Sequence, residues 1–300
     1  MTKLNIWIQG ARPKTLGAAI APVIVGSAIA FYENSFNLLI SFLCLVIGIS
    51  IQIGVNYAND YSDGIRGTDD QRVGPVRLVG QKLAEAKSVK AAAIIFFLIA
   101  CIAGLLMSIY SKQWWFLLIG LSAIISAWTY TGGPKPYGYA GFGELFVFIY
   151  FGLVAVIGTI YAQTLFFKPY FLVYAVSIGF FASAILVANN LRDFEKDYQN
   201  QKRTLAVKIG ESKTRFLYSL LMILPFILVF ALFIVAILNP NVNVGVSRLL
   251  QLLALPLAYQ CIKTVLAKAK NRDLIPVLVK TGQTEIFWAF LVALSFVINF

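Results

Sequence analysis

Long, unbroken runs of apolar residues alternate with short polar segments along this chain. A helix needs about 20 apolar residues to cross a hydrocarbon core of roughly 30 Å, and runs of that length recur from end to end. They predict nine membrane-spanning helices, at residues 15–32, 37–59, 89–110, 113–131, 141–163, 170–190, 215–238, 247–267 and 281–300. Transmembrane β-strands would instead show short alternating segments, so we expect an all-α integral membrane fold.

Composition supports a lipid environment. Hydrophobic residues make up 59% of the chain and charged residues only 13%, whereas about 25% of the residues in soluble proteins are charged. The first 14 residues are polar and basic, and the first apolar run lacks the small-residue end of a cleavable signal. We therefore expect the first span to remain in the protein.

The basic residues are divided unequally between the two sides of the predicted bundle. With nine spans, the N-terminus and the connections after spans two, four, six and eight share one side. This side holds all of the 25 Lys and Arg except Lys112, Lys168 and Arg248. The positive-inside rule makes it cytoplasmic, with Met1 inside and Phe300 outside. The net charge of +12 is then a topology signal, and no nucleic-acid partner is expected.

Several kinds of chemistry are excluded by residue type. The chain has no histidine, and its three cysteines, Cys44, Cys101 and Cys261, lie in apolar runs without C-x-x-C spacing. Zinc sites, haem ligation by histidine, and Ser-His or Cys-His catalysis are therefore not expected. Any reaction has to use carboxylates, amides, cations, aromatic groups or a hard metal ion.

Seven of the 13 acidic residues fall in two polar stretches, each of which continues a predicted span beyond the membrane. Residues 56–70 and 189–197 form these stretches, and their acidic members are Asp60, Asp63, Asp69, Asp70, Asp193, Glu195 and Asp197. Both stretches contain the pattern Asn-x-x-x-Asp, and the four spans between them return the chain to the same face. We therefore expect the two stretches to form one site.

The spacing of polar residues in the second stretch matches one face of a helix. Residues i and i+4 are neighbours on a helix, so Asn189, Asp193 and Asp197 are predicted to form one oxygen-bearing stripe. In the first stretch, glycines at positions 64 and 67 are predicted to break the corresponding helix, which leaves Asp69 to supply the later carboxylate.

Oxygen ligands without histidine or thiolate suit Mg²⁺, which binds through one or two carboxylates together with phosphate oxygens. The cations near the two stretches outnumber what the carboxylates need, and they are Arg66, Arg72, Arg77, Lys135, Arg192, Lys202 and Arg203. A bound polyanion would account for both sets of charges. The alternative is that these are solvated loop charges that only set topology; two matching clusters on one face favour a site.

Short motifs are spread over nearly the whole chain. They are Ala11-Arg-Pro-Lys-Thr15, Asn59-Asp-Tyr-Ser-Asp63 through Asp69, Arg72-Val-Gly-Pro-Val-Arg-Leu78, Gly132-Gly-Pro-Lys-Pro136, Asn189-Asn-Leu-Arg-Asp193 and Lys202-Arg-Thr-Leu-Ala-Val-Lys-Ile-Gly210. Together they resemble the UbiA-type intramembrane prenyltransferases, most of all the branch that prenylates 1,4-dihydroxy-2-naphthoate. The chain has Gly67 where much of the superfamily has its third aspartate, and Asp69 takes that role, a spacing that resembles the naphthoate branch.

The resemblance implies one domain over residues 1–300, a nine-transmembrane-helix bundle around a central cavity. Cytoplasmic cap segments would lie between spans two and three and between spans six and seven. It implies Mg²⁺-dependent transfer, with Mn²⁺ as a substitute, of a polyprenyl group from polyprenyl diphosphate to 1,4-dihydroxy-2-naphthoate. Loss of CO₂ and pyrophosphate would give demethylmenaquinone at the cytoplasmic face of the cell membrane, with membrane lipid around the protein.

The resemblance also assigns roles by motif position. The expected metal ligands are Asn59, Asp63, Asp69, Asn189, Asp193 and Asp197. The candidates for binding the diphosphate are Arg72, Lys135, Arg192, Lys202 and Arg203. Arg12 and Lys14 are candidates for the acceptor carboxylate, and Asp60 for removing the proton of the acceptor hydroxyl.

Two other functions remain open at this point. The acceptor is 4-hydroxybenzoate, homogentisate or another ring in the first alternative. In the second, the chain is an ion-coupled transporter, because paired carboxylates on helices also occur in carriers. Carriers place ionisable groups near the middle of the membrane, whereas Asp63 and Asp193 lie at the ends of apolar runs, which favours the enzyme.

Overall fold

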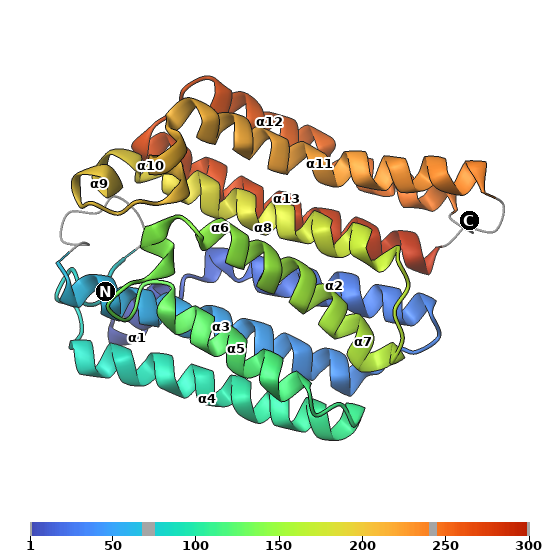
Figure 1. The fold of residues 1–300 in the computed structure, drawn as a ribbon, viewed down its shortest axis with the longest axis horizontal. Helices are drawn as coiled ribbons and strands as arrows, with labels where there is room; N and C mark the ends of the chain where they lie inside the picture. The colour runs from blue at the N-terminus through green and yellow to red at the C-terminus, as the bar shows by residue number, and fades with distance from the viewer. Residues whose placement is uncertain (1, 68–75, 240–244, 299–300) are drawn as a thin grey trace.

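The chain folds into a bundle of long helices that run along one common axis (Figure 1). The computed structural model describes residues 2–67, 76–239 and 245–298, and no strand occurs among them. The elements are α1 (Lys3–Ala11), η1 (Pro13–Thr15), α2 (Gly17–Tyr32), α3 (Leu38–Ile65), α4 (Ala86–Ser111), α5 (Phe116–Thr129), η2 (Tyr137–Ala140), α6 (Gly143–Val147), η3 (Phe148–Ile157), α7 (Gly158–Thr164), α8 (Phe171–Arg192), α9 (Phe194–Gln199), α10 (Leu205–Ile209), α11 (Glu211–Leu238), η4 (Val246–Ala254), α12 (Leu255–Leu266), η5 (Asn271–Asp273) and α13 (Leu274–Val297).

The helices confirm a multi-pass, all-α membrane fold. Among the described residues, seven helical segments are long and apolar enough to cross a membrane, or eight if the bent pair formed by α1–η1 and α2 is one span. The predicted span at 113–131 is instead the shorter apolar helix α5. By length, therefore, the structure does not reach the predicted count of nine, although an apolar helix occupies each predicted position.

The bend at the start of the bundle follows from the Arg12-Pro13 pair. Arg12 adopts a left-handed conformation with φ 55° and ψ 65°, and Pro13 begins η1. Proline disfavours a helical conformation in the residue before it but suits the first turn of a helix. The chain direction therefore changes by 50° before α2, and α1 leaves the apolar side chains of Leu4 and Ile8 exposed.

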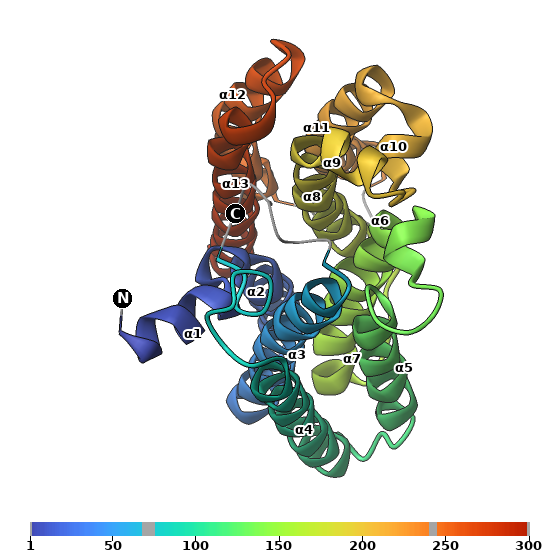
Figure 2. The ribbon, with the colours of Figure 1, turned by 90° about the vertical axis from the view of Figure 1, so that its left-hand side faces the viewer.

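Helix α8 lies inside the bundle and organises the packing around it. It packs against α11, α13 and η3, and Figure 2 shows these elements and α2, α3, α5 and α7 end-on. The Phe181 ring of α8 lies 5.7 Å from Trp288 of α13 and 6.0 Å from Phe226 of α11, measured between centroids. In lipid, close packing of this kind replaces the hydrophobic effect as the force that holds helices together.

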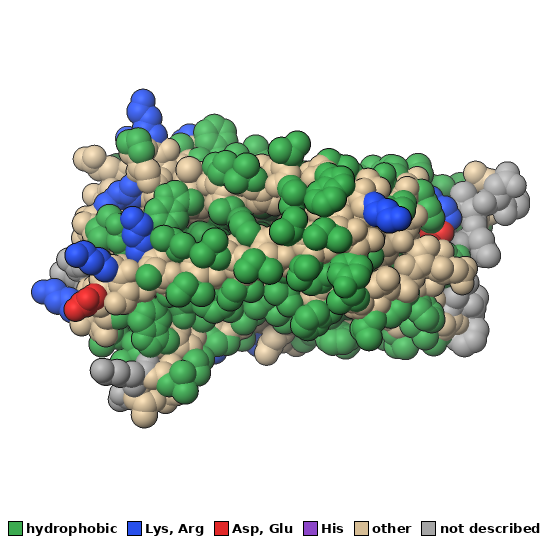
Figure 3. All heavy atoms as spheres, turned by 90° about the horizontal axis from the view of Figure 1, so that it is seen from below, with side chains coloured by type: hydrophobic (Ala, Val, Ile, Leu, Met, Phe, Trp, Pro, Cys, Tyr) green, Lys and Arg blue, Asp and Glu red, His purple; other side chains and the backbone are tan. Residues whose placement is uncertain are grey.

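Charged side chains gather mainly at one end of the molecule. Figure 3 shows hydrophobic side chains along the length of one face, with most of its Lys and Arg side chains at the end where α9 and α10 lie in Figure 1. Two of the exceptions expected from the sequence, Lys112 and Lys168, follow the C-terminal ends of α4 and α7. The distribution agrees with a bundle that spans a membrane with one basic side.

A glycine contact between η3 and α8 gives a test of this packing. A Cβ added at Gly152 would lie 2.5 Å from the Gly179 Cα and 2.7 Å from the Ala175 main-chain oxygen. Because neither backbone atom can move alone, Gly152→Ala should destabilise the protein by about 1–3 kcal/mol. The measurement is the thermal unfolding midpoint in detergent. Gly104→Ala is the control, because its Cβ would meet nothing within 4 Å; equal midpoints for the two variants would contradict the packing.

Candidate active site

A cavity of about 1130 Å³ runs through the bundle. At one end, here called the polar end, its wall contains Arg12, Lys14, Asn56, Asn59, Asp63, Asn189, Asn190, Arg192, Asp197 and Lys202. At the other, the apolar end, the wall contains Val23, Cys44, Met107, Phe116 and Tyr161. At about 1.5 Å per residue, α3 rises about 28 Å between Cys44 and Asp63. The cavity can therefore hold a long apolar molecule with a charged head.

Asn59 and Asp63 lie in the last two turns of α3, and side chains from the α5–α6 connection hold both. The Thr131 hydroxyl donates to the Asn59 Oδ1, at 2.7 Å. The Tyr139 hydroxyl donates to the Asp63 Oδ1. Asn59 and Asp63 both belong to the cavity wall, so two of the predicted ligands lie as expected.

The second cluster differs from the predicted single helical stripe. Helix α8 ends at Arg192 and α9 begins at Phe194, so Asp193 is a turn between two helices, with φ −93° and ψ 5°. The Asp193 main-chain oxygen still accepts from the Asp197 N–H at 2.8 Å, which keeps the two segments in register. Asn189 and Asp197 therefore both reach the cavity wall.

The Arg192 side chain forms hydrogen bonds with two members of the second cluster, Asn189 and Asp193. Its guanidinium donates to both Asp193 carboxylate oxygens, at 2.7 and 2.8 Å, and to the Asn189 Oδ1 at 2.8 Å. Both members of the Arg192–Asp193 pair are buried. Asp193 itself is not part of the cavity wall, whereas Arg192 is. In this arrangement Arg192 is a partner of the predicted ligands and also presents positive charge to the cavity.

Lys202 joins the two clusters. Its Nζ lies 3.4 Å from the Asp63 Oδ2 and 4.5 Å from the Tyr139 ring centroid. Its main-chain N–H donates to the Asp197 oxygen at 2.8 Å. Lys202 is buried in the cavity wall, so the structure pairs this predicted cation with the Asp63 carboxylate and ties its backbone to the main-chain oxygen of Asp197 in the second cluster.

The connection between α5 and α6 lies over the first cluster. Arg66, just after α3, donates to the main-chain oxygens of Thr131 and Gly133, and its guanidinium lies 5.6 Å from the Tyr139 ring centroid. Lys135 lies in the same connection, but its side chain is exposed and not part of the cavity wall. Its contact with diphosphate thus stays a prediction.

The remaining predicted residues are divided between the cavity and the surface. Arg12 and Lys14 belong to the cavity wall, and the Arg12 Nη1 lies 3.5 Å from the Asn56 Oδ1. Arg203 is exposed and lies outside the wall. Asp69 and Arg72 lie outside the described residues.

Asp60 is buried and turned away from the cavity wall. Its Oδ2 accepts from the Leu78 N–H at 2.8 Å, and its Oδ1 accepts from the Val79 N–H at 3.1 Å. Both oxygens are therefore engaged by the main chain, which is an anchoring geometry for the segment that follows the first acidic stretch. Its role as a base stays untested.

The described residues of the acidic clusters do not form a metal site by themselves. Among the described residues, no three acidic, cysteine or histidine side chains converge closely enough to hold a metal ion. Their oxygens come in small groups that face one cavity. This arrangement suits a metal that also takes ligands from a bound anion, as Mg²⁺ does with phosphate groups.

Comparison with known proteins settles the family. The sequence profile of the UbiA prenyltransferase family matches residues 19–291. The chain belongs to the UbiA prenyltransferase family. Solved UbiA structures agree in fold: a UbiA homolog from Aeropyrum pernix K1 in its apo form gives a TM-score of 0.68 at 11% identity, covering 95% of this chain and 97% of that one.

Two curated relatives in the family carry the same name. The 1,4-dihydroxy-2-naphthoate octaprenyltransferase of Mycobacterium leprae is 46% identical over 293 residues, covering 98% of this chain and 96% of the relative. That of Escherichia coli is 37% identical over 221 residues, covering 72% of each chain. A UbiA homolog from Archaeoglobus fulgidus, solved bound to DMAPP and Mg²⁺, shares the fold at 16% identity, with a TM-score of 0.59 and coverage of 96% and 98%.

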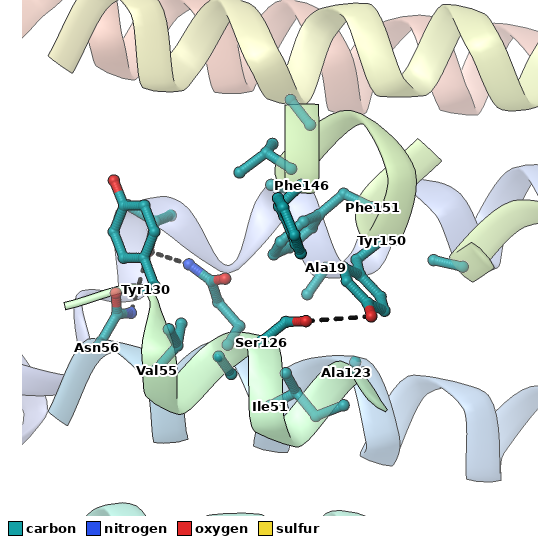
Figure 4. A pocket seen from close by; sticks show the side chains of 18 of the residues that line it. Ala19, Ile51, Val55, Asn56, Ala123, Ser126, Tyr130, Phe146, Tyr150 and Phe151 are labelled. Carbon is teal, nitrogen blue, oxygen red and sulfur yellow. Dashed lines mark hydrogen bonds between the residues drawn. The ribbon is translucent and has the colours of Figure 1, made fainter. Parts of the chain in front are cut away.

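An aromatic row in the cavity wall was not predicted from the sequence. Tyr130, Tyr137, Phe146 and Tyr150 follow one another with centroid distances of 5.5, 4.2 and 6.2 Å. Figure 4 shows Tyr130, Phe146 and Tyr150, with the Ser126 hydroxyl donating a hydrogen bond to the Tyr150 hydroxyl. Burial raises the pKa of the Tyr137 hydroxyl above its ordinary value, so this phenol is neutral at physiological pH.

Other wall residues were also missed as site residues. Asn56, Arg77 and Asn190 line the cavity, and Tyr139 binds Asp63. Asn56 and Asn190 stand three residues before and one residue after the asparagines of the repeated pattern, which was the available signal. Arg77 lies in a quoted motif, but nothing local in the sequence indicates that Tyr139 reaches α3.

Asp60 provides a test that separates anchoring from base catalysis. Asp60→Asn leaves one acceptor oxygen for two main-chain donors, so it should cost about 1–3 kcal/mol of stability. It should also speed hydrogen exchange at Leu78 and Val79, measured by mass spectrometry. Asp273→Asn, at an exposed carboxylate between α12 and α13, is the control and should leave exchange at these amides unchanged. If Asp60→Asn lowers turnover while leaving both exchange and stability unchanged, anchoring is wrong.

Proposed function

We propose that this chain transfers a polyprenyl group from polyprenyl diphosphate to 1,4-dihydroxy-2-naphthoate. The bond between the allylic C1 and the diphosphate oxygen breaks and pyrophosphate leaves, a new bond joins C1 to the ring, and the carboxylate leaves as CO₂. The ring keeps both hydroxyls, so the product is demethylmenaquinol, the reduced form of demethylmenaquinone. The observation that carries the proposal is the convergence of Asn59, Asp63, Asn189 and Asp197 at the polar end of a long apolar cavity. The names of the curated relatives support the choice of acceptor.

The donor atoms at the polar end fit Mg²⁺. They are carboxylate and amide oxygens, which a hard cation prefers, and Mn²⁺ accepts the same ligands. The residues that would hold the metal are Asn59, Asp63, Asn189, Asp193 and Asp197, with Asp69 proposed from the sequence alone. When bound, Mg²⁺ would neutralise the negative charge that develops on the departing pyrophosphate.

The cations of the wall would bind the same leaving group. Lys202 and Arg192 are buried beside the acidic clusters, so each presents its charge where water screens it least. Arg12 and Lys14 stand at the same end on the N-terminal segment and are proposed to bind the acceptor carboxylate. The apolar end would hold the isoprenoid tail and exclude water from the allylic cation.

We infer that the polar end of the cavity faces the cytoplasm. The ends of α3 and α8 lie at the basic end of the bundle, together with α9 and α10. The positive-inside rule assigns this end to the cytoplasm, with the N-terminus inside and the C-terminus outside. Residues 1–300 would then act as one catalytic domain.

Product analysis tests the proposed reaction. Purified protein, given dihydroxynaphthoate, a polyprenyl diphosphate and Mg²⁺, should form demethylmenaquinol, detected by mass spectrometry directly or as demethylmenaquinone after oxidation in air. Asp63→Asn and Asp193→Asn should each lower turnover about 100-fold or more, because each removes a negative charge that would bind the metal. Removal of divalent metal by chelation should have the same effect.

The control for these variants is Asp273→Asn, because Asp273 is exposed between α12 and α13. Its turnover should equal that of the unaltered chain. Prenylation of 4-hydroxybenzoate or homogentisate in place of dihydroxynaphthoate would change the acceptor. Absence of any prenylated product would reject the reaction.

Cysteine labelling tests the orientation independently of the chemistry. In a chain lacking its three native cysteines, Ser212→Cys should react with an impermeant maleimide only from the cytoplasmic side. Phe167→Cys, in the exposed connection between α7 and α8, should react only from outside. The measurement uses vesicles of both orientations, and the reverse pattern would place the polar end outside.

A further inference from the structure

A buried carboxylate next to the cavity has no part in the site described so far. Glu144 lies in the first turn of α6 with 8% of its surface exposed, and it is not part of the cavity wall. Its Oε1 accepts from the Asn190 Nδ2 at 2.9 Å. Asn190 is a wall residue, adjacent in sequence to Asn189. Glu144 therefore reaches the cavity through the Asn190 amide.

This contact fixes which way the Asn190 amide faces. The Glu144 Oε1 is the acceptor in this hydrogen bond, so Asn190 turns its NH₂ group toward Glu144. The amide oxygen points the opposite way, and no described residue donates a hydrogen bond to it. Because Asn190 belongs to the wall, this carbonyl oxygen is available to a molecule in the cavity.

Glu144 is held in place by a second contact. The Ser183 hydroxyl of α8 donates to the Glu144 main-chain oxygen at 3.1 Å, and Ser183 is not a wall residue. Asn190 lies on the same helix, two turns further along. Helix α8 therefore fixes both the backbone and the carboxylate of Glu144.

Part of the aromatic row packs against α6, the helix that carries Glu144. Phe146 follows Glu144 by two residues, and its ring stacks on Tyr137 at 4.2 Å between centroids. A Cβ added at Gly143 would lie 3.0 Å from the Tyr130 ring, so Tyr130 packs directly on the start of α6. A planar ring placed against these side chains would gain stacking contacts, and Asn190 belongs to the wall of the same cavity.

The Asn190 carbonyl oxygen favours the aromatic acceptor over the diphosphate as its binding partner. An ionised diphosphate offers only acceptor oxygens and could meet a carbonyl oxygen only through a metal ion, whereas a ring hydroxyl can donate to that oxygen directly. We propose that Glu144 is a positioning residue that orients Asn190, so that the Asn190 Oδ1 accepts a hydrogen bond from a hydroxyl of the aromatic acceptor. This inference rests on the proposed prenyl transfer and deepens it by naming the place of the acceptor ring beside Tyr137 and Phe146.

Steady-state kinetics test the positioning role. Glu144→Met removes the acceptor while keeping the length of the side chain, so the Asn190 amide is free to turn. It should raise the KM for dihydroxynaphthoate about tenfold, with the donor KM changed by less than about twofold. Glu144→Gln retains an oxygen that accepts from Asn190 and should keep the acceptor KM within about threefold. Ser177→Ala is the matched control: it removes a hydroxyl from the same helix that donates only to the Val173 main-chain oxygen, away from Glu144 and the cavity wall, and it should leave both constants unchanged.

A paired substitution covers the case in which Glu144→Met does not fold. Asn190→Asp places two carboxylates against each other and should lose acceptor binding. When Glu144→Gln is added, the glutamine NH₂ group at position 144 can donate to one oxygen of the aspartate at position 190. The other aspartate oxygen still faces the cavity, so the double variant should recover much of the acceptor binding. Equilibrium binding of dihydroxynaphthoate to the metal-free protein gives a readout separate from turnover.

The outcomes separate this inference from the proposed reaction. If the unaltered chain forms no prenylated naphthol, the proposed function fails. If it does, an unchanged acceptor KM in Glu144→Met, or no recovery in the double variant, overturns the positioning role. A rise confined to the donor KM, or to the concentration of Mg²⁺ required, would instead place Asn190 at the diphosphate and overturn the acceptor assignment.

Discussion

The ion pair between Lys202 and Asp63 joins the two halves of this molecule. Asp63 ends the second long helix, and Lys202 follows the helix that carries the other acidic cluster, with both side chains buried. A buried charge that loses its partner is strongly destabilising, so these two segments have to meet. Both residues line the cavity, so their contact brings the two acidic clusters to its polar end. Tyr139 adds a ring and a hydroxyl to the same contact.

Most of the fold was predictable because lipid leaves the chain few choices. Backbone groups in a bilayer have to bond within a helix, so each apolar run predicts a helix directly. The structure differs from the prediction at two places near the ends of the predicted spans. Helix α5 begins only at Phe116, after Trp114 and Trp115, aromatic residues typical of a membrane interface. The second acidic stripe is divided at Asp193, which ends one helix and precedes the next.

The sequence predicts a site residue only where the signal comes from the spacing of residues close together in the chain. Asn59 and Asp63 are one helical turn apart and face the cavity together, as their spacing predicts. Asp60 is one residue from Asn59, which turns it about 100° around the helix and toward Leu78. Tyr139 and Glu144 gave no comparable signal, because their roles depend on contacts with residues far along the sequence.

The left-handed backbone at Arg12 has a consequence for the stability of the protein. Residues other than glycine adopt this conformation at a cost of roughly 1–2 kcal/mol, yet the position carries a long cation in the cavity wall. Glycine would relieve the strain there and remove the guanidinium in one step. The chain thus carries a backbone cost at a position where a guanidinium lines the cavity, so selection for heat resistance alone would favour glycine there and remove this charge from the wall.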